Sequence, residues 1–131
     1  MAGVFLSSQA IERPQARALA DALQAAGVAV EHSPSNPLDG EDDRWSDWYE
    51  VGLPRAIRAS QVAVLILDSG WDSSTWMAEE ARLSFAILGA DRVHFWNPSN
   101  VTIRAAGMLP YLKARLPDEI SEVIAKLGAH L

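Results

Sequence analysis

The chain has 131 residues, 49% of them hydrophobic, and a formal net charge of −6 at pH 7. These values are typical of a single globular domain over residues 1–131, and the acidic balance argues against nucleic acid or an anionic membrane as the main partner. The absence of cysteine excludes disulfides, thiolate metal sites and cysteine nucleophiles. No apolar run is long enough to span a bilayer, and residues 1–8 lack the features of a secretory signal, so we expect a cytoplasmic protein.

The first third of the chain predicts a strand, a helix and a second strand. Residues 3–7 form a short apolar run that predicts a buried strand. Residues 11–26 are rich in alanine and carry one apolar stripe, which predicts a helix with Gly27 as its C-cap. Residues 28–32 predict the second strand, and residues 33–44 are dense in turn formers, which indicates a long loop.

The middle of the chain predicts a broken helix and then a central strand. Residues 45–60 have a helical pattern that Gly52 and Pro54 interrupt, so we expect a break, with Pro54 near the start of the second piece. Residues 61–67 form the most apolar run of the chain. A continuous apolar run is typical of a parallel strand that is covered on both faces.

The last part of the chain predicts two helices around a further strand. Residues 72–74 offer N-cap side chains for a helix that runs to about Leu88, and residues 92–96 predict a fourth strand. Residues 105–116 predict a short helix or an irregular segment, and Pro117 is expected to begin a final helix over residues 117–127.

Strands that alternate with helices predict a flavodoxin-like three-layer α/β sandwich with a parallel sheet of four or five strands. In such sheets, ligands bind at the carboxyl ends of the strands. This rule selects four segments of the chain. They are Ser7 with Ser8, residues 33–44, residues 68–74, and the residues from Trp96 onward.

One carboxylate falls on the apolar side of its predicted helix. On a helical wheel of residues 76–89, Glu80 lies inside the apolar arc, whereas Glu79 lies outside it, one turn from Arg82. An unpaired buried carboxylate is costly, so Glu80 either pairs with an arginine, caps a backbone group, or faces a cleft and acts there. Its position soon after the predicted central strand favours the cleft.

The segment around Glu80 resembles the signature of Toll/interleukin-1 receptor (TIR) domains. In that family a Ser-x-Trp element begins the helix after the strand, and a glutamate lies four residues beyond the tryptophan. The matching residues are Ser74, Trp76 and Glu80. Residues 68–71, with the sequence Asp-Ser-Gly-Trp, precede this element as they do in the family.

The order of the other elements agrees with that family over about residues 3–96. The opening strand that ends in Ser7 resembles the family's first strand, and residues 37–40 stand where the family carries its BB loop. The chain departs from the pattern at Ser8, where the family often has an aromatic residue, and residues 97–116 match nothing in the family.

The resemblance implies an activity. Enzymatic TIR domains cleave NAD at the nicotinamide–ribose bond, and the glutamate that matches Glu80 is their catalytic residue. NAD would then be a substrate rather than a cofactor, and no metal is required. Positive charge develops on the ribose in such a reaction, and a carboxylate in a dry cleft stabilises it. The resemblance further implies an NAD glycohydrolase or ADP-ribosyl cyclase that acts as a homo-oligomer in bacterial defence signalling.

Several side chains near Glu80 are expected to contact the substrate. They are Ser7, Ser8, Trp45, Trp48, Ser69, Ser74 and Trp76. Strand-end turns and core packing are the alternative roles of these serines and tryptophans. Trp76 is further expected to lie buried beside Glu80 and to raise the pKa of that carboxyl. Arg13, Arg44 and Arg55 are the cations considered for the pyrophosphate of NAD.

The histidines and the acidic loop have simpler interpretations. His32 and His94 lie in or beside predicted strands without metal-ligand spacing, so both are expected to be structural, and His130 lies near the chain end. The acidic residues of segment 39–43 lack the spacing of a calcium loop and are expected to be solvated.

Two other function classes stay open. Nucleoside 2-deoxyribosyltransferases share this kind of open sheet and use a glutamate at a similar place as a nucleophile, so Glu80 also fits that chemistry. A non-catalytic TIR scaffold would act instead through residues 33–44 and its helix surfaces. Fold-level likeness does not separate these classes.

Overall fold

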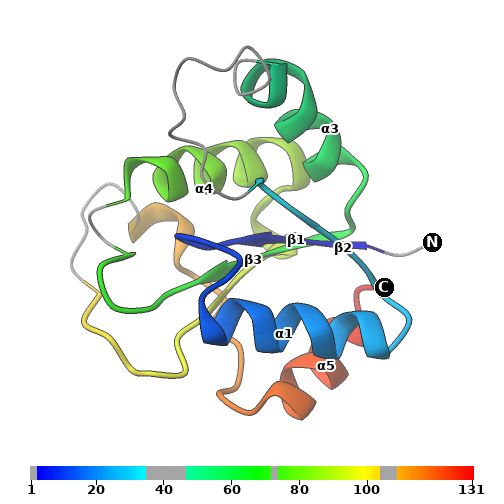
Figure 1. Cartoon of the computed structure of the whole chain (residues 1–131), viewed down its shortest axis with the longest axis vertical. Coiled ribbons are helices and arrows are strands. Elements are labelled where there is room, and N and C mark those ends of the chain that lie inside the picture. The colour runs from blue at the N-terminus through cyan, green and yellow to red at the C-terminus, as the bar shows by residue number, and fades with distance from the viewer. Residues whose placement is uncertain (1–2, 35–46, 72–73, 104–108) are drawn as a thin grey trace.

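A computed structural model describes residues 3–34, 47–71, 74–103 and 109–131 (Figure 1). The strands are β1 (Gly3–Ser7), β2 (Ala29–His32), β3 (Val62–Ile66) and β4 (Val93–Trp96). The α-helices are α1 (Pro14–Ala25), α3 (Leu53–Arg58), α4 (Thr75–Leu88) and α5 (Ile120–Gly128). Short helical turns are η1 (Trp48–Gly52), η3 (Ala90–Arg92) and η4 (Leu109–Tyr111).

The described strands form one parallel sheet in the order β2-β1-β3-β4. The fold is the flavodoxin-like α/β sandwich that the sequence predicts, with four strands in the part of the chain described. The connection from β1 leads outward to β2, and the chain then crosses back to β3 and continues outward to β4. The strand order therefore reverses between β1 and β3, and the carboxyl ends of strands at such a point are where open α/β sheets bind ligands.

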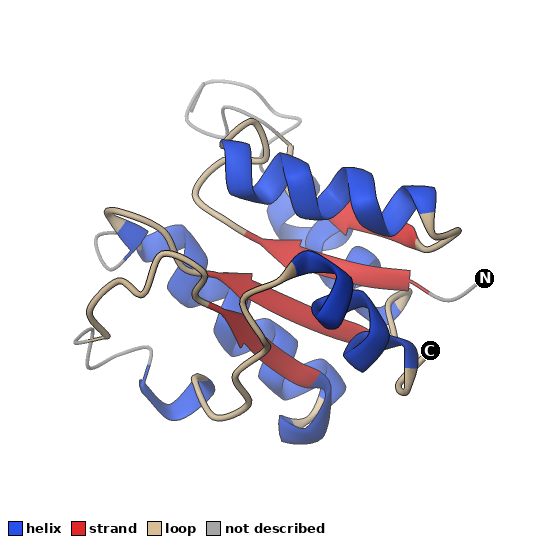
Figure 2. Cartoon of the chain, turned by 90° about the horizontal axis from the view of Figure 1, so that it is seen from below, coloured by secondary structure: helices blue, strands red, loops and turns tan. Residues whose placement is uncertain are grey.

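Helices cover both faces of the sheet (Figures 1 and 2). Alternate residues of β1 show why, because successive side chains of a strand point to opposite faces. Leu6 packs in the hydrophobic cluster of α1 and α5, whereas Phe5 packs in the cluster of α3 and α4. The five residues of β3 are all buried, as a central strand covered on both sides requires.

The helix boundaries follow local chemistry, although α1 begins at Pro14 and not at residue 11 as predicted. Pro14 stands in the first turn of α1, where its missing N–H is not needed, and Gly27 after the helix has φ +82°. The side chain of Ser74 caps α4 by accepting a hydrogen bond from the Met77 N–H at 3.1 Å. Gly89, with φ +87°, ends α4. Within the described ranges, no helix combines the length and apolar character needed to cross a membrane.

The interrupted helical segment is confirmed where the structure describes it. One turn of π-helix, η1, ends at Gly52, and α3 follows with Pro54 in its first turn. Predicted residues 45 and 46 lie outside the described ranges. A π-helical turn is uncommon and often marks a functional site.

The predicted start of the last helix at Pro117 is wrong, because α5 begins at Ile120. The chain just before it is held in extended form by β4. The Phe95 N–H donates to the Ala114 carbonyl, and the Leu116 N–H donates to the Phe95 carbonyl, both at 2.8 Å. This pairing joins segments that are far apart in the sequence. The prediction used only the preference of proline for the first turn of a helix, so it could not include this pairing.

Removal of the α4 cap is expected to destabilise the fold. Ser74→Ala leaves the Met77 N–H without its side-chain acceptor and is expected to lower the free energy of unfolding by about 1 kcal/mol. Ser74→Asp keeps an acceptor and should retain most of the stability. Urea unfolding followed by circular dichroism measures both, and equal stability of Ser74→Ala and the wild type would contradict the capping role.

Candidate functional site

Glu80 lies on the sheet-facing side of α4, with only 1% of its surface exposed. Its carboxylate sits between two serine hydroxyls. Ser7 Oγ donates to Oε1 at 2.8 Å, and Ser33 Oγ donates to Oε2 at 2.5 Å. Within the described part of the chain, Glu80 forms no salt bridge, and two hydroxyls from strand ends are hydrogen-bond partners of its buried carboxylate.

The pleat of β1 places Ser7 under Glu80. Ser7 follows Phe5 by two positions and so points to the same face, the one that α4 covers. Because Ser7 is the last residue of β1, it lies at the carboxyl end, beside the point where the strand order reverses. Ser33 directly follows β2, the neighbouring strand, so two adjacent strand ends supply the two hydroxyls.

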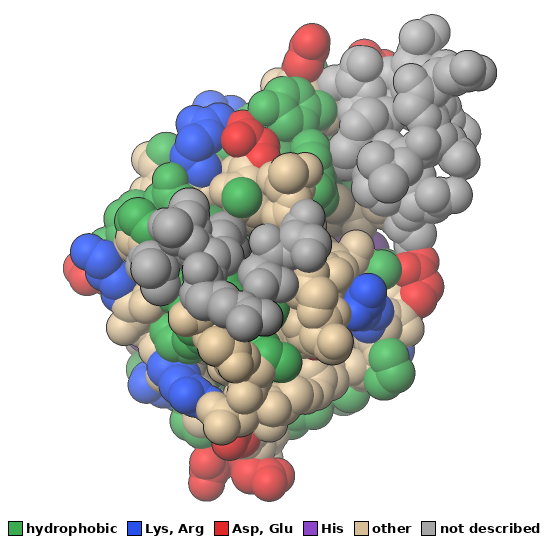
Figure 3. Space-filling model, turned by 90° about the vertical axis from the view of Figure 1, so that its left-hand side faces the viewer, with side chains coloured by type: hydrophobic (Ala, Val, Ile, Leu, Met, Phe, Trp, Pro, Cys, Tyr) green, Lys and Arg blue, Asp and Glu red, His purple; other side chains and the backbone are tan. Residues whose placement is uncertain are grey.

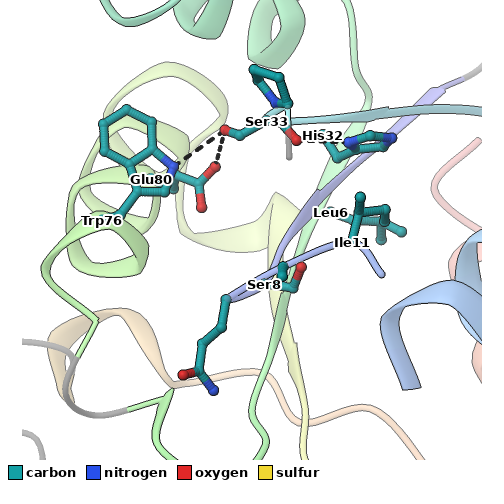
Figure 4. A pocket seen from close by; sticks show the side chains of 10 residues that line it. Leu6, Ser8, Ile11, His32, Ser33, Trp76 and Glu80 are labelled. Carbon is teal, nitrogen blue, oxygen red and sulfur yellow. Dashed lines mark hydrogen bonds between the residues drawn. The ribbon is translucent and has the colours of Figure 1, made fainter. Parts of the chain in front are cut away.

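Ser33 is also the acceptor for two tryptophans. The indole Nε1–H of Trp48 lies 3.1 Å from Ser33 Oγ, and that of Trp76 lies 3.3 Å from the same atom. Figure 4 shows the chain of contacts from Trp76 through Ser33 to Glu80. Three elements, η1, β2 and α4, thus meet at a single hydroxyl oxygen.

Gly52 allows the Trp48 ring to lie where it does. A Cβ atom at position 52 would stand 2.5 Å from the Trp48 ring, closer than carbon atoms approach. The glycine in the sequence, first interpreted only as a helix breaker, therefore also makes room for this indole. On the outer side, the Tyr49 ring packs against Trp76 with their centroids 5.5 Å apart.

The two adjacent glutamates of α4 have opposite environments. Burial raises the pKa of Glu80 to about 7, although the hydrogen bonds from Ser33, Ser7 and Trp76 act to lower it. Glu79 accepts hydrogen bonds from Arg82 and from the Tyr49 hydroxyl, and the Arg82 guanidinium lowers the pKa of Glu79. The carboxyl of Glu80 therefore has a pKa near neutral pH, whereas the carboxyl of Glu79 is held in its ionised form.

The predicted burial of Trp76 is wrong, whereas the predicted rise in the pKa of Glu80 is confirmed. Trp76 is half-buried rather than buried, and its indole N–H lowers the pKa of Glu80. The rise in that pKa comes from the desolvation of the whole site.

A small cavity adjoins Glu80 at the strand ends (Figure 4). Its walls come from the segment after β1, the segment after β2, and α4. Residues that line it include Ser8, Gln9, His32, Ser33, Trp76 and Glu80. Its volume is about 20 Å³, close to what one water molecule requires. A sugar ring needs more room, so a nucleotide enters only if these walls move apart.

The structure gathers most, but not all, of the expected contact residues. Ser7 and Trp76 contact Glu80, Trp48 donates to Ser33 beside it, and Ser8 lines the cavity. Two of the expected serines serve elsewhere in the described chain. The Ser69 carbonyl accepts from Gln9 and Arg13, and Ser74 caps α4. Trp45 lies outside the described residues.

Sequence reasoning did not single out for the site three polar residues that line the cavity, namely Ser33, Gln9 and His32. Gln9 was not singled out, and its amide also reaches the Asp68 carboxylate and the Ser69 carbonyl. His32 was interpreted as structural, yet it lines the cavity and its Nδ1 lies 2.8 Å from the Ser33 carbonyl oxygen. All three follow or end a predicted strand at the carboxyl edge, which is the signal that could have found them.

Of the cations considered for a pyrophosphate, Arg13 is the one that the structure places near this edge. Its guanidinium donates to the Ser69 carbonyl at 3.0 Å and pairs with Asp68 at 3.5 Å. Arg55 is exposed on α3, and Arg44 lies outside the described residues. Figure 3 views the carboxyl-end side of the sheet, where the visible Lys and Arg side chains are dispersed among acidic and uncharged ones.

The other titratable residues in the described ranges form no further centre of this kind. Among the residues that the structure describes, no group of three or more His, Asp or Glu is placed to hold a metal ion. The acidic segment 39–43 lies outside the described ranges. His94 is buried on β4, its ring packs against that of His130 at 4.9 Å, and burial lowers its pKa to about 4.

Comparison with protein-family models and with curated proteins gives no match. Among solved structures, the chain is similar to the TIR domains of the activated Roq1 resistosome that recognises the pathogen effector XopQ. The identity is 21% over 100% of this chain and 73% of that one, with a TM-score of 0.49. It is also similar to the R. palustris response regulator RPA3017 of red light signaling, at 11% identity over 98% and 90% of the chains and a TM-score of 0.49. Neither likeness identifies a family or an activity for this chain.

Replacement of the buried carboxyl is expected to change how stability depends on pH. Between pH 4.5 and about 7, folded Glu80 keeps a proton that the unfolded chain has lost, so the wild type loses stability as pH rises through this window. Glu80→Gln removes this loss. The free energy of unfolding of Glu80→Gln relative to the wild type should therefore rise by about 3 kcal/mol from pH 4.5 to 8.

The neighbouring glutamate is a matched control for this measurement. The pKa of Glu79 is lowered in the folded protein, so its contribution is present above pH 4.5 and is lost as pH falls. Glu79→Gln should therefore show the opposite sign at low pH. Denaturant unfolding at several pH values measures both variants, and parallel curves for Glu80→Gln and the wild type would contradict the assignment.

Proposed function

We propose that this chain is a TIR-like NAD-cleaving enzyme, an NAD glycohydrolase or ADP-ribosyl cyclase that releases nicotinamide. The observation that carries the proposal is the placement of Glu80, a buried carboxylate between two hydroxyls at the carboxyl ends of parallel strands. The spacing of Ser74, Trp76 and Glu80, which resembles the TIR signature, supports the same activity.

The proposed chemistry needs one carboxylate. The bond between C1′ of the ribose and the nicotinamide nitrogen breaks, and the electron pair leaves with nicotinamide, which departs as a neutral base. The ribose carbon becomes positively charged, and ionised Glu80 stabilises this charge at short range in a site with little water. A water molecule or a nucleophilic atom of the same ADP-ribose then adds to C1′.

Glu80 must be ionised for this role, which links the rate to pH. Because burial raises its pKa to about 7, the fraction of ionised Glu80 rises as pH increases through 7. We expect NAD cleavage to increase over the same range and to level off above it.

The present size of the cavity bears on how substrate enters. Ser33, Trp48 and Trp76 close the site on the outer side through their shared contacts, and the space left is that of one water molecule. We propose that NAD binding separates this group, with Arg13 as the described cation nearest to the place of the pyrophosphate. Self-association into a homo-oligomer, in bacterial defence signalling, is part of the same proposal.

Measurement of NAD cleavage tests the proposal directly. Concentrated protein is incubated with NAD, and nicotinamide and the ADP-ribose products are separated by chromatography. We expect wild type to release nicotinamide and Glu80→Gln to be slower by on the order of 100-fold or more, because a neutral amide does not stabilise the cationic ribose. Glu79→Gln, changed at the half-buried neighbour that faces away from the site, should keep the wild-type rate.

The remaining outcomes separate the alternatives. No nicotinamide release at any protein concentration would overturn the proposal. Exchange of bases between deoxynucleosides, abolished by Glu80→Gln, would instead favour a nucleoside 2-deoxyribosyltransferase. Absence of both activities would favour a non-catalytic scaffold, in which Glu80→Gln leaves partner binding intact.

A further inference from the structure

The hydroxyl of Ser33 has a restricted choice of hydrogen bonds. A serine hydroxyl offers one donor hydrogen and two acceptor lone pairs. An indole N–H can only donate, so Ser33 Oγ accepts from Trp48 and from Trp76, whose N–H is shared between Ser33 and Glu80. The remaining contact of Ser33 Oγ, with Glu80 Oε2, then takes its only hydrogen.

Ser7 is not restricted in the same way. Ser7 Oγ lies 2.8 Å from Glu80 Oε1, and none of the hydrogen bonds described for this part of the chain directs an indole N–H at it. Its hydroxyl can rotate, so it donates to an ionised Oε1 and accepts from a protonated one. The two oxygens of one carboxyl therefore have different partners.

We infer that Ser33 is a positioning residue whose hydroxyl is held by the two indoles as a fixed donor to Glu80 Oε2, so that the proton of Glu80 is carried by Oε1 opposite Ser7. Ser33 thereby orients the carboxyl, so that Oε2 accepts the hydrogen bond and Oε1 carries the proton. This assignment stands on the contacts of the substrate-free protein, and its importance for the reaction rests on the proposed function.

Few other charged groups face this carboxyl in the described structure. His32 of β2 lines the same cavity, and its ring contacts the Ser33 backbone rather than the hydroxyl. Glu79 of α4 is engaged by Arg82 and Tyr49 on the outer side. At the end of β3, Asp68 is bound by Gln9 and Arg13. Titration of Glu80 is therefore governed mainly by burial and by the hydroxyls and indole that contact it.

The inference is tested by the NMR titration of Glu80 in protein with 13C-labelled glutamate, without NAD. Wild type should titrate near pH 7. Ser33→Ala removes the donor that favours the ionised form, so its midpoint should rise by about one pH unit. Ser7→Ala should move the midpoint much less, because the Ser7 hydroxyl can hydrogen-bond both the ionised and the protonated form of Glu80. An equal shift in the two variants would overturn the assignment of the proton to Oε1.

Trp48→Phe tests whether the indole acts through Ser33, since phenylalanine keeps an aromatic side chain but has a smaller ring without the N–H donor. It frees Ser33 to accept from protonated Glu80, so the midpoint should rise in the wild-type background and stay unchanged when Ser33→Ala is already present. Equal shifts in both backgrounds, or no shift in the first, would overturn the inference. Tyr49→Phe, from the same turn, should leave the midpoint unchanged, and Ser33→Thr should restore the wild-type value.

A second readout covers the case in which Ser33→Ala does not fold. The Nε1–H signal of Trp48 in wild type should exchange slowly with solvent, and Trp48→Phe alone must still raise the midpoint. Fast exchange of this proton would overturn the inference. Because NAD is absent throughout, failure here leaves the proposed function untouched, and a protein without NAD cleavage can still show the expected titration.

Discussion

The burial of one carboxyl group is the constraint on which the site depends. Glu80 is removed from water, and such a group is tolerated only with hydrogen-bond partners or with a raised pKa. Both occur here. Its partners, Ser7 and Ser33, lie 73 and 47 positions away in the chain, so only the assembled sheet can supply them. The strand order places their two strands side by side, and α4, which covers one face of the sheet, brings Glu80 to their carboxyl ends.

Much of the fold could be predicted because its signals are local. Apolar runs predicted β1 and β3, short strand patterns predicted β2 and β4, and Ser74 and Gly27 marked helix ends through capping and positive φ. The last helix could not be placed in the same way. Its start depends on the backbone hydrogen bond between Leu116 and Phe95. These residues are far apart in the sequence, so local patterns do not predict that contact.

The site could be predicted only in part, for a related reason. Helical periodicity correctly predicted that Glu80 lies on the sheet-facing side of α4 and Glu79 on the outer side. This prediction needs only the sequence of one helix. The contacts of Ser33 depend on the register of β2 and on the rotation of η1, neither of which leaves a pattern in the sequence. The sequence therefore indicated the carboxylate and the edge of the sheet, but not the hydroxyl that orients it.

Glu79 and Glu80 show what the fold contributes beyond residue type. The same side chain, one position apart, has its pKa lowered by Arg82 in one case and raised by burial in the other. The raised pKa is unfavourable for stability at neutral pH, because ionisation of a buried carboxyl opposes folding. A surface position would avoid this loss, but water there would weaken the field that a carboxylate exerts on a cationic sugar. The burial of Glu80 therefore lowers the stability of the folded protein, and it does so at the position where the proposed chemistry needs a poorly solvated charge.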